Sequence, residues 1–390
     1  MAKLLLIDND PMLARAYQRV FEKSGCELFS TAASVESLAA VASIAPDLLL
    51  LDSQPGETSA GEWLTRVRSL PGFETLPALV FWNPYLADSL DLEDERVKVV
   101  SKAGSTPEIL VGSVLELLAK AGSGVAAVGA AGVTLEAESG SPSDPLKLLF
   151  AEVSPAIVGT LNSSWQAFVR TEAEQSGVAA LRDLARVVHA LSAHAAVAGY
   201  RAFAQVAAAF EALLWELTAD PFSINPSSRR TMAGALDFLV QMSRSPEAAA
   251  RADGMLQGLA FAVDDEATSL WAVGTALELA GMRPLTLDNP ELALEVLKQN
   301  RFDLIFLDVD MPGRTGYDVC KVLRGFSTNQ TTPVVFVTGL TDFSSRAKST
   351  LSGGNDFIAK PFLLPELAVK ALILLARSRI GVIGTKSSGG

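Results

Sequence analysis

The sequence predicts two α/β domains, each built on a five-stranded, doubly wound parallel sheet, on either side of an all-α four-helix bundle. Three observations lead to this prediction. Short apolar runs alternate with helical patterns near both ends of the 390-residue chain, which is typical of a parallel sheet covered on both faces. The two alternating segments share the spacing of their aspartates. The middle of the chain shows helical periodicity alone.

The C-terminal α/β domain is expected over residues 257–380, with residues 381–390 as a disordered tail. Its apolar runs predict strands at 259–263, 284–287, 303–307, 333–337 and 355–358. Its helical patterns fall at 266–280, 290–299, 316–326, 342–352 and 363–377. The run at 304–307 is wholly apolar, which favours a central strand buried on both faces.

The N-terminal α/β domain is expected over residues 1–121 because it repeats the C-terminal one. The spacing from Asp8 to Asp52 is 44 residues, and so is that from Asp264 to Asp308. A fixed internal spacing of this kind indicates two copies of one domain. Residues 122–144 follow the first copy. They are rich in Gly, Ala and Ser and predict a flexible linker.

Residues 145–250 are expected to form the helical bundle. They contain no convincing strand, and their apolar residues recur at helical spacing in four segments. These segments are 146–174, 178–197, 200–218 and 226–244. Glycines and the stretch "DPFSINPSS" separate them, which is typical of an up-down bundle.

Composition and charge exclude several classes of function. Apolar residues make up 49% and the net charge is −12, which argues against nucleic-acid binding because that relies on Lys and Arg. The two cysteines, Cys26 and Cys320, offer no disulfide framework or metal spacing, so a reducing compartment is expected. No signal-peptide core or membrane span was found, so we expect a cytoplasmic protein that does not enter membranes.

Carboxylates stand where strands of the C-terminal domain end. Asp264 and Asp265 follow the first apolar run, and Asp308 ends the third. Ligands bind at this edge of a doubly wound sheet. Two carboxylates at about 4 Å repel by roughly 4 kcal/mol at an effective dielectric near 20, so the cluster needs a cation. Carboxylates with room for water suit Mg²⁺.

Two further strand ends carry groups that suit a phosphate. Thr338 ends the fourth run and offers a hydroxyl, with Gly339 leaving the approach open. Lys360 ends the fifth run and offers a positive charge. A carboxylate nucleophile with a metal, a hydroxyl and a lysine predicts phosphoryl transfer that forms an aspartyl phosphate.

The motifs "VDDE", "LDVDMPG", "FVTG" and "AKPF" occur in this order in the same segment. With them, residues 257–380 resemble the CheY-like receiver domains of response regulators, whose fold is flavodoxin-like. The resemblance implies a phosphoacceptor at Asp308, a magnesium site at Asp264, Asp265 and Asp310, and phosphate-contacting or switch roles for Thr338, Lys360 and Phe357. The alternatives are that Asp265 only caps a helix and that Lys360 is a surface charge.

The N-terminal copy resembles the same family with departures. Asp8, Asp52 and Lys102 are kept, but Asn9 replaces the second acid and Trp82 stands where the threonine is expected. Valine occupies the aromatic switch position, at residue 99. We expect a pseudo-receiver that serves in docking or in a homodimer, and phosphorylation of Asp52 is the alternative.

The chain has two histidines, His189 and His194, on one predicted helix. The segment "LARVVHALSAHAAVAGY" resembles the histidine phosphotransfer (HPt) domain, and His189 matches its phosphorylated histidine. Ser192 and Ala193 replace the Lys and Gly of the motif. Small neighbours at Ala185, Ser192, Ala193 and Ala196 predict an open face for a docking partner. His194 is expected to be packed, and no metal site is expected at the histidines.

Together these features predict a two-component phosphorelay protein that is not itself an enzyme. A separate histidine kinase would phosphorylate Asp308, which could exchange phosphate with His189, and a downstream signalling protein would read the change. The alternative is an interaction scaffold in which the first receiver and the bundle only dock or dimerise. An exposed His189 would favour the relay.

Overall fold

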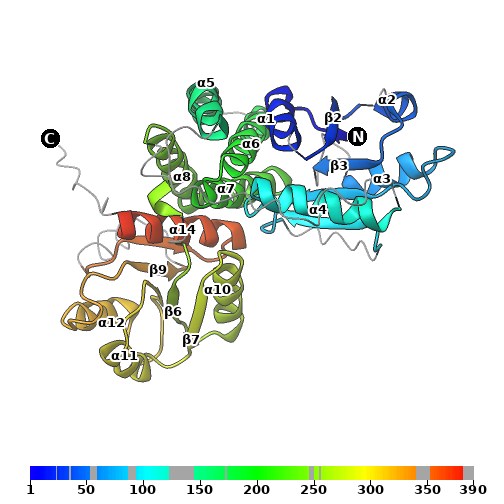
Figure 1. Ribbon diagram of the computed structural model, residues 1–390. Coiled ribbons are helices and arrows are strands. Elements are labelled where there is room, and N and C mark those ends of the chain that lie inside the picture. The colour runs from blue at the N-terminus through cyan, green and yellow to red at the C-terminus, as the bar shows by residue number, and fades with distance from the viewer. Residues whose placement is uncertain are drawn as a thin grey trace. The chain divides into compact units, whose positions relative to one another are not determined.

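The structure is a computed structural model that describes residues 1–22, 24–34, 37–52, 59–86, 94–122, 145–171, 174–245, 250–253, 256–339 and 352–380. The chain divides into two compact units, each with one parallel sheet and part of the helical segment (Figure 1). The first unit is Met1–Ile157 with His189–Ala204, and the second is Val158–Val188 with Gln205–Gly390.

The first sheet has the strand order β2-β1-β3-β4-β5 with all pairs parallel. Its strands are β1 (Ala2–Ile7), β2 (Cys26–Thr31), β3 (Leu48–Asp52), β4 (Ala78–Trp82) and β5 (Val97–Ser101). Its helices are α1 (Pro11–Phe21), α2 (Ser37–Ile44), α3 (Ala60–Arg68) and α4 (Pro107–Lys120). Successive strand residues enter opposite cores: Leu4 packs with α1 and α4, and Leu5 packs with α2 and α3.

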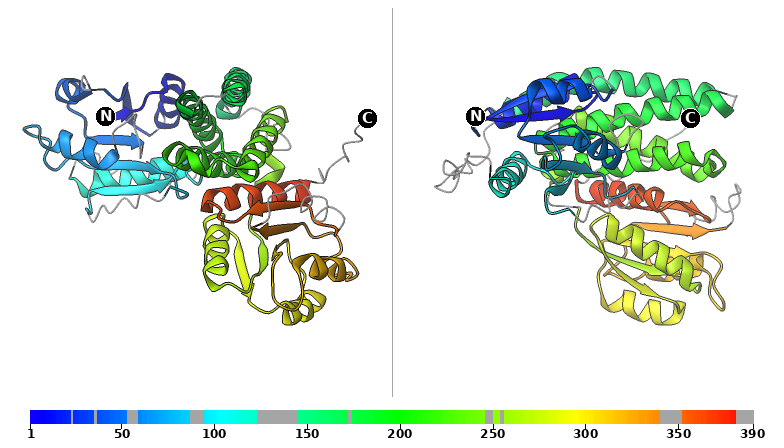
Figure 2. Two further views of the ribbon diagram at one scale, coloured as in Figure 1. Left: turned by 180° about the vertical axis from the view of Figure 1, so that it is seen from behind. Right: turned by 90° about the vertical axis from the view of Figure 1, so that its right-hand side faces the viewer.

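The second sheet repeats this winding with the order β10-β9-β8-β6-β7. Its strands are β6 (Leu259–Val263), β7 (Arg283–Leu287), β8 (Leu304–Asp308), β9 (Val334–Thr338) and β10 (Asp356–Ala359). Its helices are α10 (Ala267–Leu279), α11 (Pro290–Gln299), α12 (Gly316–Leu323) and α14 (Leu364–Ile380). Helices α10 and α14 contact each other on one face, and α11 and α12 on the other (Figure 1 and Figure 2).

The predicted elements of the second sheet agree with the observed ones to within one residue for every strand. Strand β8 is buried throughout, as expected for a central strand with helices on both faces. Most of the predicted helix at 342–352, the linker from residue 123 on and the tail at 381–390 lie outside the described residues.

Four helices occupy the predicted helical segment: α5 (Pro145–Arg170), α6 (Glu174–Val197), α7 (Arg201–Ala219) and α8 (Pro226–Ser243). In the first unit Phe150 of α5 packs on Phe203 of α7. In the second unit Arg229 of α8 lies over Phe168 of α5. Their arrangement as one up-down bundle stays a prediction.

Helix α7 is long and apolar enough to cross a membrane by length and composition, although the sequence predicts no membrane span. Within the protein 72% of its apolar window is buried. A buried core helix passes the same test of length and composition, so the helix is weak evidence for a membrane span.

A close approach of two backbones requires glycine at the start of α12. The Gly316 N–H donates to the Val309 carbonyl at 3.2 Å. A Cβ at Gly316 would lie 2.1 Å from the carbonyl oxygen of Asp308. Helix α12 can therefore begin directly against the end of β8 only because residue 316 has no side chain.

We predict that Gly316→Ala destabilises the protein by roughly 1–3 kcal/mol, because the methyl group overpacks the end of β8. Urea unfolding of the full chain measures this. Gly274→Ala in α10 is the matched control, since its Cβ would meet only Thr286 Cγ2, at 3.8 Å. That variant should be neutral or slightly more stable. Equal stability of the two variants would contradict the close approach.

Candidate functional site

Three aspartates meet at the carboxyl edge of the second sheet. Asp264 follows β6 and Asp308 ends β8, and these two strands are paired. Asp264 is 2% exposed and Asp308 is 3% exposed, while Asp265 is exposed. One carboxylate oxygen from each lies within 4.8 Å of the others. The parallel sheet thus brings together the cluster that the sequence predicted.

Lys360 supplies the positive charge that this cluster requires. Its Nζ lies 2.8 Å from Asp264 Oδ2 and 2.9 Å from Asp308 Oδ1. Burial raises the pKa of Asp308 and the neighbouring acids add to the rise, while Lys360 partly offsets it. Burial alone would lower the pKa of Lys360, but the two carboxylates outweigh it and raise that pKa. Lys360 is therefore not a solvated surface charge.

Hydrogen bonds fix the two buried carboxylates. Asp264 accepts from the Ser269 hydroxyl and, at 3.0 Å, from the Glu266 N–H. Asp308 accepts from the Asp310 N–H at 3.1 Å. Glu266 is the N-cap residue of α10, so the alternative that Asp265 caps this helix is not supported. The sequence did not predict the role of Ser269. A serine in the first turn of a helix that follows an aspartate could have indicated such a hydrogen bond.

The remaining predicted residues of this site lie on β9 and β10. Thr338 ends β9 and is 1% exposed. A Cβ at Gly339 would meet no described atom within 4 Å, so that position leaves room beside Thr338. Phe357 of β10 is 5% exposed, and the guanidinium carbon of Arg230 lies 5.3 Å from its ring centre. Sequence reasoning did not anticipate this arginine, which comes from α8.

The donor set at this edge fits a hard divalent cation. All three ligands in the cluster are carboxylates, which Mg²⁺ prefers, and the exposed Asp265 leaves one side open to water. Among the residues that the structure describes, Lys360 is the cation that pairs with both buried acids. A dication would share that task.

The first sheet carries a related but altered arrangement. Asp52 and Lys102 are both buried, and Lys102 Nζ lies 2.6 Å from Asp52 Oδ2. Burial raises the pKa of Asp8, and His189 and Lys102 lower it. The Asn9 side chain accepts instead from the Ala33 N–H, at 2.8 Å. The site therefore has one acid fewer than the second.

Trp82 and Val99 depart further from the second site. Trp82 is half-buried at the end of β4. Its ring nitrogen is buried and has no hydrogen-bond partner among the described residues. Val99 on β5 is 37% exposed. Trp82 lacks the hydroxyl that Thr338 offers in the second site. Val99 lacks the aromatic ring of Phe357.

His189 lies against the first site, within the same unit. Its Nε2 is 2.6 Å from Lys102 Nζ and 3.5 Å from Asp52 Oδ2. Its side chain is 20% exposed. One ligand atom each from Asp8, Asp52 and His189 lies within 4.8 Å of the others. The sequence predicted no metal site at the histidines. The acids that lie beside His189, Asp8 and Asp52, come from strand ends far from it in the sequence.

The expectation of an open face beside His189 was wrong. Its small neighbours are buried: Ala185, Ser192, Ala193 and Ala196. The Ser192 hydroxyl donates to the Ala204 carbonyl at 3.2 Å, and Ala193 belongs to the core that contains β1. Small residues here allow close packing. His194 is packed as expected, 3% exposed with Nε2 3.2 Å from Asp10 Oδ2.

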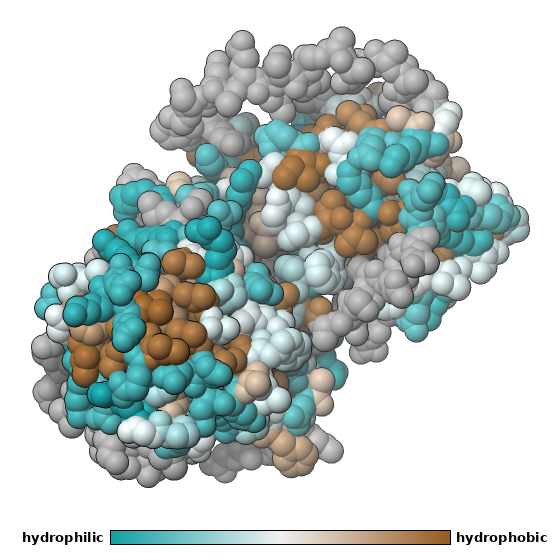
Figure 3. Space-filling model, turned by 90° about the horizontal axis from the view of Figure 1, so that it is seen from below, coloured by the Kyte–Doolittle hydropathy of each residue, from teal (hydrophilic) through white to brown (hydrophobic). Residues whose placement is uncertain are grey.

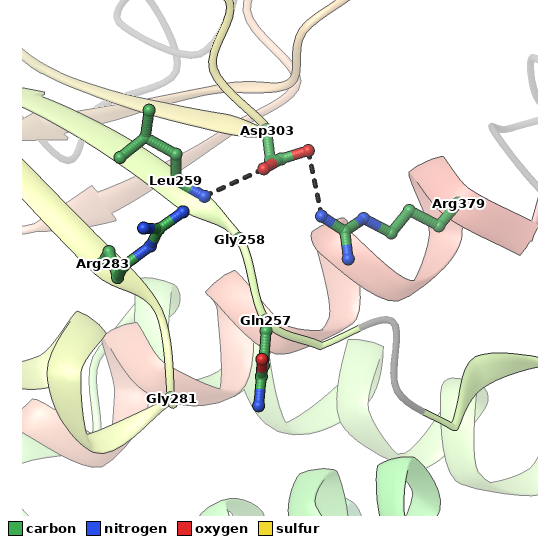
Figure 4. A pocket seen from close by; sticks show the side chains of 7 residues that line it. All are labelled: Gln257, Gly258, Leu259, Gly281, Arg283, Asp303 and Arg379. Atoms are coloured by element: carbon green, nitrogen blue, oxygen red, sulfur yellow. Dashed lines mark hydrogen bonds and ion pairs between the residues drawn. The ribbon is translucent and has the colours of Figure 1, made fainter.

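A pocket of about 430 Å³ lies at the opposite edge of the second sheet, where β6 and β7 begin (Figure 4). Asp303 accepts from the Leu259 N–H at 2.9 Å and pairs with Arg379 at 3.0 Å. Because the aspartate cluster lies at the carboxyl ends of the strands, this pocket takes no part in its chemistry.

Comparisons with known proteins match part of the chain. The family model for the response regulator receiver domain matches residues 260–372. Protein RcaC of Microchaete diplosiphon is 31% identical over 144 residues, 37% of this chain and 21% of RcaC. The phosphate regulon transcriptional regulatory protein PhoB of Rhizobium meliloti is 30% identical over 131 residues, 34% of this chain and 57% of PhoB. The chain thus spans a fifth to just over half of these two relatives.

Solved structures of receiver proteins give similar matches. Chemotaxis protein CheY4 of Vibrio cholerae is 31% identical, with 30% of this chain and 96% of that chain covered and a TM-score of 0.28. A two-component response regulator from Clostridium difficile is 28% identical, with 31% and 97% covered and a TM-score of 0.29.

The strand order, the buried aspartates held by a lysine and the family match all concern the same segment. Residues 260–372 are a response regulator receiver domain of two-component signalling.

Proposed function

We propose that the chain is a two-component phosphorelay protein whose C-terminal receiver accepts a phosphoryl group on Asp308. The observation that carries this proposal is the buried Asp308 carboxylate, 2.9 Å from Lys360 Nζ and beside Asp264. In the reaction, a carboxylate oxygen attacks the phosphorus of a partner's phosphohistidine. The N–P bond breaks, and its electron pair returns to the partner's imidazole.

The neighbouring groups then have distinct roles. Mg²⁺ would be held by Asp264, Asp265 and the backbone carbonyl of Asp310, and it would neutralise charge on the phosphoryl group. The Thr338 hydroxyl and Lys360 would bind phosphoryl oxygens. Phe357 would change its packing when Thr338 moves, and so carry the signal to the surface.

We propose that a separate histidine kinase donates the phosphate and that a downstream signalling protein reads the result in the cytoplasm. The chain itself would act as a phosphoacceptor and not as a kinase. Exposed apolar side chains in the second unit, Trp271, Leu285 and Leu292, support contact with proteins. Figure 3 shows hydrophobic residues gathered inside a hydrophilic surround, which is typical of such surfaces.

The contacts of His189 favour Asp52 over Asp308 as its exchange partner. An ammonium group only donates hydrogen bonds, so the ring nitrogen 2.6 Å from Lys102 must accept. That nitrogen carries the lone pair that a phosphoryl acceptor needs, and Asp52 lies 3.5 Å away. The scaffold hypothesis is supported by the same contacts, because the imidazole lies against Lys102 and Asp52 in a site where Asn9 replaces an acid. A homodimer through the pseudo-receiver belongs to that hypothesis.

We predict that Asp308→Asn abolishes labelling of the chain by acetyl phosphate in the presence of Mg²⁺, because the nucleophile is lost. Intact mass measures the added phosphate in each variant. Asp303→Asn, at the opposite edge of the sheet, is the control and should be labelled like the wild type. Equal labelling of Asp308→Asn would remove Asp308 as the primary acceptor.

The relay and scaffold hypotheses differ in the fate of phosphohistidine. Phosphoramidate, an N–P donor, would label His189 in a relay, and acid lability of the label identifies it. We predict that Asp52→Asn then prolongs the lifetime of phospho-His189 several-fold, whereas Asp308→Asn does not. His194→Ala should still be labelled. Failure to label His189 in every variant would favour the scaffold.

The affinity for Mg²⁺ should depend on pH through Asp308. Asp308 lies in one carboxylate cluster with the metal ligands Asp264 and Asp265, so its protonation removes a negative charge that favours the cation. Affinity is therefore full above the pKa of Asp308 and falls as the pH drops through it. That pKa is raised above 3.8, so the loss should begin at a higher pH than for an ordinary aspartate. Calorimetric titration with Mg²⁺ over a pH series measures this. A midpoint at or below 3.8 would contradict it.

A further inference from the structure

One imidazole and two carboxylates meet at the carboxyl edge of the first sheet. Asp8 follows β1 and Asp52 ends β3, and these two strands are paired. His189 comes from the C-terminal half of α6 and belongs to the same compact unit. One ligand atom from each of the three residues lies within 4.8 Å of the others. The first sheet therefore offers nitrogen and oxygen ligands together, whereas the described cluster of the second sheet consists of carboxylates.

The spacing of these atoms fits a tetrahedral metal ion. His189 Nε2 lies 3.5 Å from Asp52 Oδ2. Zinc bonds to imidazole nitrogen and carboxylate oxygen are about 2.0–2.2 Å long, so two ligand atoms of a tetrahedral site lie about 3.3–3.6 Å apart. Asp8 Oδ1 accepts from the Asp10 N–H at 2.8 Å, and outer partners of this kind orient metal ligands. His189 and Asp52 are thus already spaced as two ligands of one ion.

The ammonium group of Lys102 takes the place of a cation among these ligands. Its Nζ lies 2.6 Å from Asp52 Oδ2 and 2.6 Å from His189 Nε2. Because an ammonium group only donates, the imidazole directs its lone pair at this cation. One ammonium charge does not balance two carboxylates, and burial raises the pKa of Asp8 although His189 and Lys102 lower it. Lys102 and a metal ion would compete for one position.

The imidazole determines which kind of ion fits this position. Mg²⁺ prefers oxygen ligands throughout, and it usually keeps several waters. Imidazole suits Zn²⁺ and other divalent transition-metal ions. Three protein ligands leave the fourth position of a tetrahedral ion to water. The His189 side chain is 20% exposed, so this position has access to solvent.

We propose that Asp8, Asp52 and His189 bind a divalent transition-metal ion of the Zn²⁺ type, which displaces the ammonium group of Lys102. The ion would join α6 to the ends of β1 and β3 more firmly than the lysine does. It would also occupy the ring nitrogen that His189 needs to accept a phosphoryl group. Metal binding and phosphorylation of His189 therefore exclude each other. This site is independent of the chemistry at Asp308.

The test measures the Zn²⁺ affinity of the full chain by competition with a coloured chelator. Excess Mg²⁺ is present to compete for the carboxylate cluster of the second sheet. His189→Gln should weaken Zn²⁺ binding at least about tenfold, since losing a ligand costs no less than losing a partner that orients one. Co²⁺ in place of Zn²⁺ should give the intense visible absorption of tetrahedral coordination, and His189→Gln should lose it.

His194→Gln is the matched control, because it makes the same substitution on the same helix. His194 Nε2 lies 3.2 Å from Asp10 Oδ2, outside the three-residue cluster. This variant should keep the Zn²⁺ affinity and the Co²⁺ spectrum of the wild type. A melting curve of each variant verifies folding.

Lys102→Met tests the competition between the lysine and the ion. Without metal this variant should melt at a lower temperature than the wild type, because Asp52 is left buried and unpaired. It should bind Zn²⁺ several-fold more tightly than the wild type, and Zn²⁺ should raise its melting temperature by more. A structural role of Lys102 alone would lower the melting temperature but leave the Zn²⁺ affinity unchanged.

The outcomes separate this site from the proposed function. Zn²⁺ binding that is equally tight in the wild type and in His189→Gln would overturn the proposal, as would a wild type that binds no Zn²⁺. Asp308→Asn should keep the His189-dependent Zn²⁺ binding. That result would support the metal site even if acetyl phosphate adds no label to the chain.

Discussion

The C-terminal receiver depends on one lysine that holds two buried carboxylates on neighbouring strands. A parallel sheet directs the ends of its strands to one edge, so the acids after β6 and β8 necessarily meet. Without a cation they would repel by roughly 4 kcal/mol at about 4 Å and an effective dielectric near 20. Lys360, which directly follows β10, offsets this repulsion by pairing with both acids. The charge balance of the site is therefore tied to the position of a third strand.

The first sheet meets the same constraint with different groups. Lys102 again pairs with the aspartate at the end of the third strand, but its second partner is an imidazole from α6. The crevice is thus filled from within the unit. The two sheets share a strand order but differ at this edge: the second site keeps an open side beside Asp265, and His189 lies against the first.

The sequence predicted the elements well because each depends on local patterns. The alternation of apolar runs and helical periods placed β6 to β10 to within a residue, and the strand ends then located Asp264, Asp308 and Lys360. Contacts between distant segments could not be predicted in this way. Periodicity shows which face of a helix is apolar, but not what covers that face.

Three features illustrate this limit. Small residues beside His189 are compatible with an open face and with close packing, and only the fold distinguishes the two. In the sequence nothing distinguishes Arg230 from other charged helix residues, yet its guanidinium lies over the Phe357 ring. Glycine is required at position 316 because the backbone carbonyl of Asp308 leaves no room for a Cβ there. Each of these depends on tertiary packing that no short motif encodes.

The burial of α14 affects which segment would have to accompany this receiver into another protein for its packing to be kept. Eleven residues of that helix, from Pro365 to Ala376, are buried, because the sheet covers one side and α8 and α10 cover others. The segment recognised as a domain is therefore smaller than the piece in which α14 is buried. A gene rearrangement that moved the receiver alone would expose Glu366 and its neighbours to water. Moving α8 together with the receiver would keep this face covered, so the module that preserves the observed packing includes part of the segment that precedes the receiver.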